Sequence, residues 1–367
     1  MNGTMSSKDL PIEIVIDILL RLPVNALIRF RSVCKSWRSI ISSPNFITTH
    51  FNNNNSVCSG SSLLYTVVSS QIQIFDNNTF DKISEVELPS DCQNDYRRIV
   101  GSCNGLLCIE ILSYQCSHPF KYALYLWNPS IRKLKTLPNS CFSYQCLDEK
   151  TSVELGLGFD CHTNDFKVIR ILHLYEPVVE VYTLSKNSWR KIEVIAPWIF
   201  TAESPVFLNE CLHWRAIYPG EVWREFILTF NIHEEVFGEL MLPDYEDGDA
   251  TVKVYKESLA LFVWGNLDDD EGPDCCYIWM MREYGVAESW VKLFTIVPEG
   301  RFWSFGFDNE IILKTKDKNL VAYNFENLNF KKIGIRIPED GDLFTFTESL
   351  VLLEGENEVL EQQKSSD

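Results

Sequence analysis

The sequence predicts an α+β multidomain protein in which a small all-α unit of three helices precedes an all-β propeller. Apolar residues recur at helical spacing from Leu10 to Ile41. After about residue 60 they alternate in short runs separated by Gly, Pro, Asn and Asp, as in half-buried strands. In this second region a hairpin with an aromatic residue recurs about every 50 residues, which is typical of propeller blades.

The composition favours a folded protein with neither a nucleic-acid nor a membrane partner. The 367 residues are 46% hydrophobic and 13% aromatic, which is enough for a large core. The net charge of −18 is opposite to the cationic surface that a general nucleic-acid binder needs. No apolar run approaches the roughly 18 residues of a membrane span, and Met1 to Leu10 do not resemble a secretory signal. We therefore expect a cytoplasmic or nuclear protein.

The first helix is expected between two Leu-Pro pairs. Pro11 suits the first turn of a helix, where its missing N–H costs no hydrogen bond, and Leu22-Pro23 should end the helix because the residue before a proline avoids helical backbone. Two neighbouring stripes carry the apolar side chains, namely Ile12, Val15, Ile16 and Leu19, and Ile14 and Ile18. A helix that is apolar on nearly all sides is buried on more than one side.

Two further helices should follow. The second begins at Pro23, and its apolar positions are Val24, Leu27 and Phe30; those of the third are Val33, Trp37, Ile40 and Ile41. Ser42-Ser43-Pro44 should stop the third helix. Three such short helices carry more apolar residues than they can hide from each other, so one face either docks on another protein or packs on the second domain. The pattern alone leaves both alternatives open.

The helical segment resembles the F-box in its plant form. The resemblance rests on the two Leu-Pro pairs, on RFRSVCKSW and on the SSPNF exit, and it covers Leu10 to Phe46. Only Asn25-Ala26 departs from the plant pattern. The resemblance implies binding to a Skp-family adaptor, which bridges to a cullin and its RING subunit. It implies an adaptor-binding surface made by Leu10, Pro11, Ile14, Ile18, Leu22, Pro23, Leu27, Val33 and Trp37. An alternative place for Trp37 is the core of the helical unit itself.

The repeat in the second region predicts six blades between about residues 60 and 353. Each hairpin carries one aromatic anchor that should fill the gap between blades: Phe75, Trp127, Tyr182, Phe230, Trp279 and Tyr323. Further strands are expected around turn signals at Asn104-Gly105, Asn164-Asp165, Asn209-Glu210 and Asp308-Asn309. The last strand should lie within residues 343–353. A β-sandwich or two stacked sheets is the alternative.

This region is similar to the F-box-associated, kelch-like region of plant F-box proteins. The segments NGLLC, WNPSIRKLKTLP and EVYTLSKNSWRKI carry the similarity. Length and layout are also similar to the S-locus F-box proteins of pollen and to F-box adaptors of defence and development. The predicted organisation is an F-box over 1–50, a linker over 51–62, the propeller over 63–353 and a polar tail over 354–367.

The acidity of the chain belongs to the second region. The first fifty residues carry a net charge of +3, so the rest carries −21. Two acidic runs are candidate target-binding residues, although such runs are commonly solvated loops: Asp244, Glu246, Asp247 and Asp249, and Asp268, Asp269, Asp270 and Glu271. Acidic loops attract a basic partner. By analogy with the pollen proteins that the chain resembles, a basic pistil ribonuclease is one candidate for that partner.

No metal site and no cofactor are expected. The twelve cysteines form no C-x-x-C pair, and a structural zinc site typically uses two closely spaced pairs. Histidines lie beside two cysteines, at Cys161-His162 and Cys211-x-His213, but reduced thiols packed in the core are the simpler interpretation.

The two resemblances imply a substrate-recognition subunit of a Skp–cullin–F-box ubiquitin ligase. The sequence contains no G-x-S-x-G elbow and no H-E-x-x-H motif, which favours a non-enzymatic role. One alternative is a propeller enzyme that acts on glycans. Another is an interaction module, independent of ubiquitin, whose helical unit serves only to dimerise.

Overall fold

The computed structural model describes most of the chain. The described residues are 10–55, 61–66, 71–76, 79–87, 96–113, 121–140, 152–174, 177–194, 204–218, 224–245, 248–266, 274–297, 303–306, 310–315, 317, 319–324, 329–336, 343–351 and 358–359. Among their helices, none is long and apolar enough to cross a membrane.

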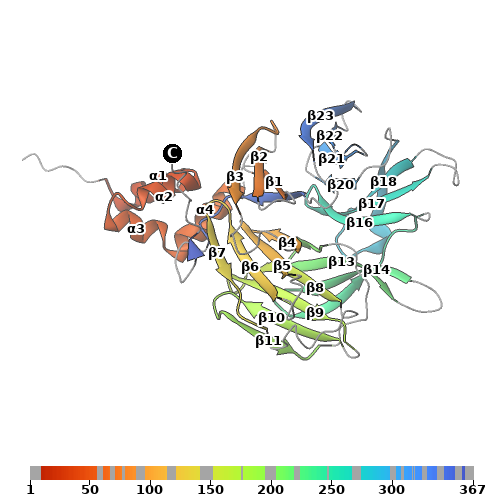
Figure 1. Cartoon of the computed structure of the whole chain (residues 1–367), viewed down its shortest axis with the longest axis horizontal. Helices are drawn as coiled ribbons and strands as arrows, with labels where there is room; N and C mark the ends of the chain where they lie inside the picture. The colour runs from red at the N-terminus through yellow and green to blue at the C-terminus, as the bar shows by residue number, and fades with distance from the viewer. Residues whose placement is uncertain are drawn as a thin grey trace, which may run out of the picture.

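Residues 10–55 form four short helices, not the three that the sequence predicts (Figure 1). They are α1 (Ile12–Leu20), α2 (Val24–Phe30), α3 (Lys35–Ile41) and α4 (Pro44–Asn55). Pro44 does follow the end of α3, but its fixed φ also suits the first residue of the next helix. The Ser43 hydroxyl caps α4 by accepting a hydrogen bond from the backbone N–H of Phe46 at 3.3 Å. Helix α4 therefore extends into the segment predicted as a linker.

The described strands form six antiparallel sheets, which are the blades of a propeller. The first three sheets, in hydrogen-bonded order, are β24 (Leu343–Thr347), β1 (Ser61–Thr66), β2 (Gln71–Asp76) and β3 (Lys82–Glu87); β25 (Glu358–Val359), β7 (Lys133–Thr136), β6 (Lys121–Asn128), β5 (Leu106–Ser113) and β4 (Tyr96–Cys103); and β11 (Ser188–Ile192), β10 (Val178–Thr183), β9 (Asp165–Leu172) and β8 (Val153–Asp160).

The remaining sheets have four strands each. They are β12 (Val206–Leu208), β13 (Cys211–Tyr218), β14 (Arg224–Asn231) and β15 (Val236–Leu240); β16 (Asp249–Tyr255), β17 (Ser258–Asn266), β18 (Asp274–Met281) and β19 (Trp290–Ile296); and β20 (Trp303–Gly306), β21 (Glu310–Lys314), β22 (Asn319–Asn324) and β23 (Asn329–Arg336). The predicted fold class, an α-helical unit followed by a propeller, is confirmed apart from the extra helix.

The first sheet closes the ring. Strand β24, near the C-terminal end of the chain, pairs with β1, so that Leu63 lies opposite Thr345. The first blade thus takes one strand from the end of the sequence and three from the beginning. This pairing joins the two ends of the propeller by backbone hydrogen bonds.

The aromatic anchors lie on the third strand of each sheet and face the preceding sheet, as predicted. Trp127 of β6 is fully buried against Ile72 and Ile74 of β2, and Phe230 of β14 packs with Val179 and Val181 of β10. Sheets therefore stack through these side chains, which no single hairpin could bury alone.

Tight turns join the first two strands of several sheets. Asn104 and Gly105 both have positive φ between β4 and β5, and Asn164 has positive φ between β8 and β9. The predicted turn at Asn209-Glu210 also has positive φ at both residues, between β12 and β13. The predicted turn at Asp308-Asn309 lies outside the described residues.

Candidate functional site

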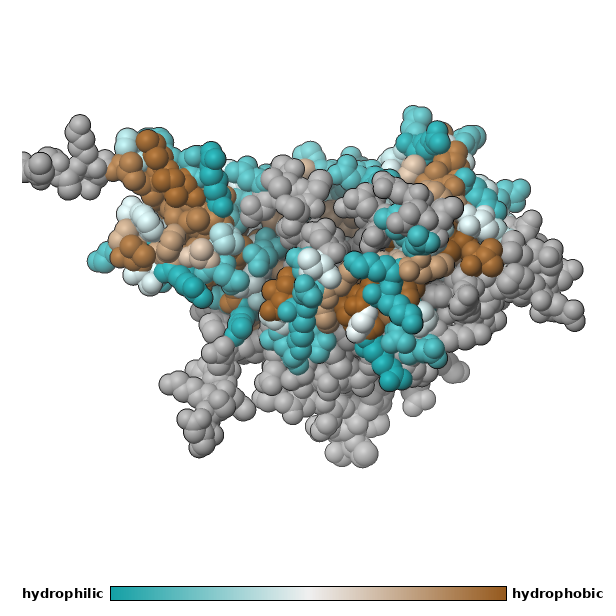
Figure 2. Space-filling model, turned by 90° about the horizontal axis from the view of Figure 1, so that it is seen from above, coloured by the Kyte–Doolittle hydropathy of each residue, from teal (hydrophilic) through white to brown (hydrophobic). Residues whose placement is uncertain are grey.

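The helical unit presents an apolar face that no other part of the described chain covers. Leu10, Ile14, Ile18 and Val33 are exposed by 60%, 46%, 48% and 61%. Pro11 and Pro23 are also exposed, and each directly precedes a helix. Figure 2 shows hydrophobic residues gathered over this unit, at the left of the view. We call these six residues the outer face.

The other residues predicted for adaptor binding lie deeper. Leu27 is fully buried in the core of the helical unit, so it supports the outer face from beneath. Leu22 and Trp37 are half-buried, and the Trp37 ring lies 5.4 Å from that of Phe30. Trp37 therefore packs partly in the core of the helical unit and keeps part of its side chain exposed. Ile12 was not predicted for this surface but is 45% exposed.

The opposite side of the helical unit packs on the propeller. Leu350, which follows β24, is buried together with Leu19, Val24 and Leu27. Ile131, from the turn between β6 and β7, packs against the same cluster. Of the two alternatives for the apolar helices, the structure shows packing on the second domain for this side, while the outer face stays exposed.

Polar contacts at this junction fix the helices further. The carboxylate of Glu348 accepts a hydrogen bond from the backbone N–H of Val24 at the start of α2, and burial raises the pKa of this carboxyl. His50 of α4 donates from Nε2 to the carbonyl of Leu22 at 2.8 Å, and burial lowers its pKa. These contacts join α1, α2 and α4 to one another and to the segment after β24.

Asn128, which sequence reasoning missed, holds that segment in place. Its buried amide donates to the carbonyl of Ser349 at 3.0 Å and to the carbonyl of Val351 at 2.9 Å. The only signal in the sequence is its position directly after the anchor Trp127. The propeller therefore contributes a built platform for the helices.

Asp249, a candidate target-binding residue at the start of β16, lies at the other end of the strands. The turn at Gly105 contacts Ser349, and the turn at Asn164 reaches Thr48 of α4, so the turns between first and second strands lie on the side of the helices. Corresponding strands of successive blades run in the same direction. The acidic run that ends at Asp249 enters β16 from the opposite side.

The structure describes only part of the acidic runs. Asp244 and Asp249 are described, whereas Glu246, Asp247 and Asp268 to Glu271 lie outside the described residues. Asp249 is exposed, and its carboxylate lies 3.5 Å from Nη1 of Arg215. It pairs in register with Trp264, two residues before the end of β17, so Asp249 and the end of β17 lie at the same end of one sheet.

A polar network fixes the first of these loops to the neighbouring blade. Arg215 on β13 pairs with Glu225 on β14, with Nη2 and Oε1 2.6 Å apart. The Tyr245 hydroxyl donates to Oε2 of Glu225 at 2.5 Å. Burial raises the pKa of Tyr245, and the hydrogen bond to the Glu225 carboxylate raises it further. Tyr245, within the connection between β15 and β16, and Asp249, at the start of β16, are therefore attached to this ion pair.

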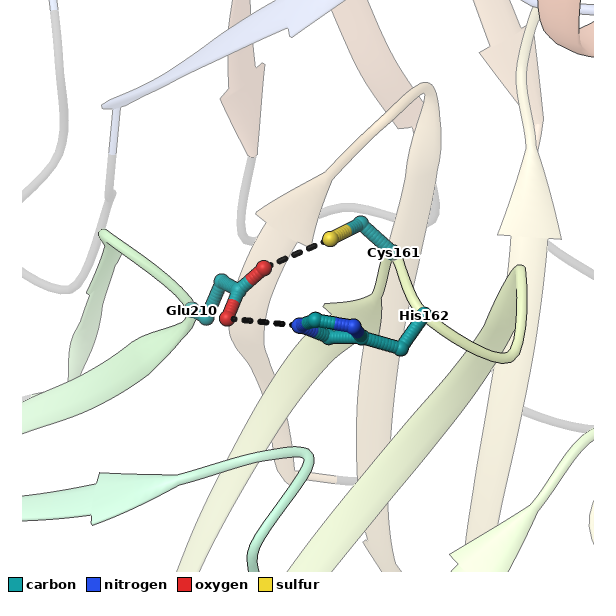
Figure 3. A group of neighbouring side chains, drawn as sticks. All are labelled: Cys161, His162 and Glu210. Carbon is teal, nitrogen blue, oxygen red and sulfur yellow. Dashed lines mark hydrogen bonds and ion pairs between the residues drawn. The ribbon is translucent and has the colours of Figure 1, made fainter.

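One group of potential metal ligands lies on the side of the helices (Figure 3). The Cys161 thiol donates to Oε1 of Glu210 at 2.5 Å, and His162 Nε2 lies 3.5 Å from Oε2 of the same carboxylate. The hydrogen bond to Glu210 raises the pKa of the Cys161 thiol. The three side chains come from the β8–β9 and β12–β13 turns of adjacent blades.

The most buried charges serve the fold. Arg170 on β9 pairs with Glu180 on β10 at 3.0 Å, and both side chains are almost completely buried. Lys167 lies 3.0 Å from the buried Asp160 and 2.9 Å from Glu235. Each pair joins neighbouring strands or blades, so these charges have a structural use where they lie.

Comparison with known proteins matches both regions. A model described as the F-box domain matches residues 8–49, and one described as the F-box associated beta propeller domain matches residues 53–351. The F-box/kelch-repeat protein At3g23880 of Arabidopsis thaliana is 26% identical over 349 residues, which cover 89% of this chain and 90% of that protein. The F-box protein CPR1 of the same plant is 28% identical, covering 87% and 80%.

Proposed function

This chain belongs to the F-box proteins that carry an F-box associated β-propeller domain, and from this premise we propose that it is the substrate-recognition subunit of a Skp–cullin–F-box ubiquitin ligase. The helical unit binds a Skp-family adaptor, and the propeller binds the protein to be ubiquitinated. The cullin and its RING subunit join through the adaptor, in the cytoplasm or the nucleus.

The observation that carries this proposal is the exposed outer face. Soluble domains rarely leave neighbouring isoleucine, leucine and valine side chains uncovered unless a partner binds them. Ile14 and Ile18 lie one helical turn apart on α1, and Leu10 precedes the same helix. Two prolines restrict the backbone at the starts of α1 and α2, so little entropy is lost when the partner docks.

The chain acts by proximity in this proposal and supplies no catalytic side chain. The adaptor side and the target side lie at opposite ends of the propeller strands. A target held on the propeller is thereby kept at a high effective concentration near the ubiquitin-conjugating enzyme. The packing of Leu350 and Ile131 against the helices keeps the two sides in a fixed relation.

Co-purification with a Skp-family adaptor tests the adaptor role. The variant that replaces Leu10, Pro11, Leu22 and Pro23 with alanine should lose the adaptor, because it removes parts of the surface and both helix starts. Its propeller should still unfold cooperatively on heating. A wild-type chain that fails to retain the adaptor, under conditions where a known F-box protein does, would contradict the proposal.

We further propose that the target is a basic protein that docks on the acidic loops, and the pollen relatives make a pistil ribonuclease the first to test. Electrostatic attraction of this kind raises the association rate and weakens with salt. The matched variant neutralises the runs by Asp-to-Asn and Glu-to-Gln changes at Asp244, Glu246, Asp247, Asp249, Asp268, Asp269, Asp270 and Glu271. It should bind a purified basic pistil ribonuclease at least about tenfold more weakly than the wild type at low salt. Equal binding by both chains, or binding by neither, would exclude this target.

A further inference from the structure

Cys161, His162 and Glu210 form a group of three potential metal ligands. Their potential ligand atoms, a sulfur, an imidazole nitrogen and a carboxylate oxygen, all lie within 4.8 Å of one another. In Figure 3 all three side chains point toward one another across the gap between two turns. We propose that these residues bind one Zn²⁺ ion.

The donor set fits zinc in kind and in charge. Thiolate, imidazole and carboxylate are the three ligand types that zinc takes in proteins. Cys161 releases its thiol proton to solvent when the metal–sulfur bond forms. The thiolate and the Glu210 carboxylate then offset the two positive charges of the ion, while the neutral imidazole of His162 adds none.

One distance between potential ligands already matches a tetrahedral zinc site. Bonds of about 2.0 to 2.3 Å place neighbouring zinc ligands about 3.3 to 3.6 Å apart. His162 Nε2 already lies 3.5 Å from Oε2 of Glu210. The Cys161 sulfur lies 2.5 Å from Oε1 through a hydrogen bond that the metal replaces. Small side-chain rotations complete the geometry, and water takes the fourth position.

The surrounding residues hold the ligands in place. Asp160 is buried and accepts a hydrogen bond from the backbone N–H of His162 at 3.0 Å, which fixes the β8–β9 turn. The same carboxylate accepts a hydrogen bond from Nδ1 of His233 at 3.1 Å. The ring centroids of His233 and His162 lie 4.2 Å apart, so His233 limits the rotation of the His162 ring. Such outer contacts orient ligands in known metal sites.

The second Cys-His pair in the sequence lacks these features. His213 uses both ring nitrogens, one 3.3 Å from the Val206 carbonyl and the other 2.8 Å from the Tyr284 hydroxyl. It is also almost completely buried. The two Cys-His pairs are therefore similar in sequence, and only the arrangement of the turns distinguishes the proposed site.

Zinc would connect two adjacent blades at the end that carries the helices. Cys161 and His162 belong to the third blade and Glu210 to the fourth. Asn164, in the same turn as Cys161, contacts Thr48 of α4 at 3.3 Å. The ion would thus stabilise the turn on which α4 lies.

Metal binding to the full-length chain tests the proposal, after treatment with EDTA and with a phosphine as the reductant. Co²⁺ serves as the spectroscopic probe, because a thiolate ligand gives a sulfur-to-cobalt charge-transfer band in the near ultraviolet. We expect one equivalent of Co²⁺ with this band, and its displacement by Zn²⁺. Cys161→Ser should remove the band, and Glu210→Gln should weaken binding at least about tenfold.

Cys34→Ser is the matched control, because Cys34 is the other exposed cysteine among the described residues. It should keep the band and the affinity of the wild type. In EDTA all variants should unfold at the wild-type temperature, and Zn²⁺ should raise this temperature for wild type and Cys34→Ser but not for Cys161→Ser. The proposal is overturned if the wild type gives no thiolate band or if Cys161→Ser retains it.

Discussion

Arg170 and Glu180 form a buried ion pair in register between β9 and β10. We predict that Arg170→Met destabilises the chain by about 3 to 5 kcal/mol, because it leaves the Glu180 carboxylate buried without its partner. The double variant Arg170→Met/Glu180→Leu should recover most of this loss, since neither charge of this pair then remains buried. Urea unfolding followed by tryptophan fluorescence measures the three free energies.

An exposed pair provides the comparison. Arg21 and Asp17 lie 3.0 Å apart on α1 but are exposed by 76% and 62%. Asp17→Asn should change the free energy of unfolding by less than about 1 kcal/mol, because water screens this pair. If the buried and exposed variants cost the same, burial does not set the strength of the Arg170–Glu180 contact.

His213 predicts a specific pH dependence. Burial lowers its pKa to about 4, so the folded chain keeps it neutral. An exposed histidine has a pKa of about 6.5, and the unfolded chain therefore takes up a proton first as the pH falls. The stabilising contribution is complete above about pH 6.5 and is lost progressively between pH 6.5 and 4.

Between pH 7 and 5 this group should cost about 2 kcal/mol of folding free energy. His213→Phe should show a correspondingly smaller loss over the same range, measured by urea unfolding at both values. Burial also lowers the pKa of His173 to about 4, so part of the pH dependence should remain in the variant. Identical losses in both chains would show that His213 does not titrate as described.

Individual site residues were only partly predictable. Helical spacing places Ile14 and Ile18 on one stripe of α1, and both are exposed. The same spacing could not reveal that Leu27 is buried. Leu350, more than 300 residues later in the chain, packs in the same buried cluster. Long-range packing of this kind leaves no periodic signal.

Among the turns of the propeller, the one at Gly105 packs against Ser349, in the segment on which the helical unit lies. Its φ is +77°, and a Cβ atom would lie 2.3 Å from the Ser349 hydroxyl. We predict that Gly105→Ala destabilises the chain by about 2 kcal/mol or more, from left-handed backbone strain and this clash. Thermal unfolding measures the effect.

Gly285 is the matched control. Its φ is +84°, but a Cβ atom there meets nothing within 4 Å. Gly285→Ala should therefore cost only the backbone strain, about 1 to 2 kcal/mol. Equal effects at both glycines would mean that the contact with Ser349 does not matter.

The elements show what local patterns can and cannot predict. The aromatic hairpins, such as that around Trp127, were predictable because each repeats a turn and an alternating strand. Helix α4 was missed because Pro44 was interpreted only as a stop, although the same residue also suits a helix start. The pairing of β24 with β1 was not predictable, since a single sequence does not indicate which distant strands meet.

In the whole molecule, the outer face of the helices is separated from the start of β16 by the length of the propeller strands. The outer face of the helices lies on one side, and the start of β16, with Asp249, lies on the other. The charge follows the same division, with +3 in the first fifty residues and −21 in the rest. In the proposed function, the adaptor and the target therefore bind separate surfaces.

Calorimetric titration of the full-length chain with a purified Skp-family adaptor measures whether the outer face binds this partner, as we propose. Ile14→Glu and Ile18→Glu should each weaken the affinity at least about 30-fold, as expected for the centre of an apolar interface. Val236→Glu, at a similarly exposed valine of the propeller, should change it less than about twofold. Unchanged affinity in both α1 variants, or no binding by the wild type, would contradict adaptor binding by the outer face.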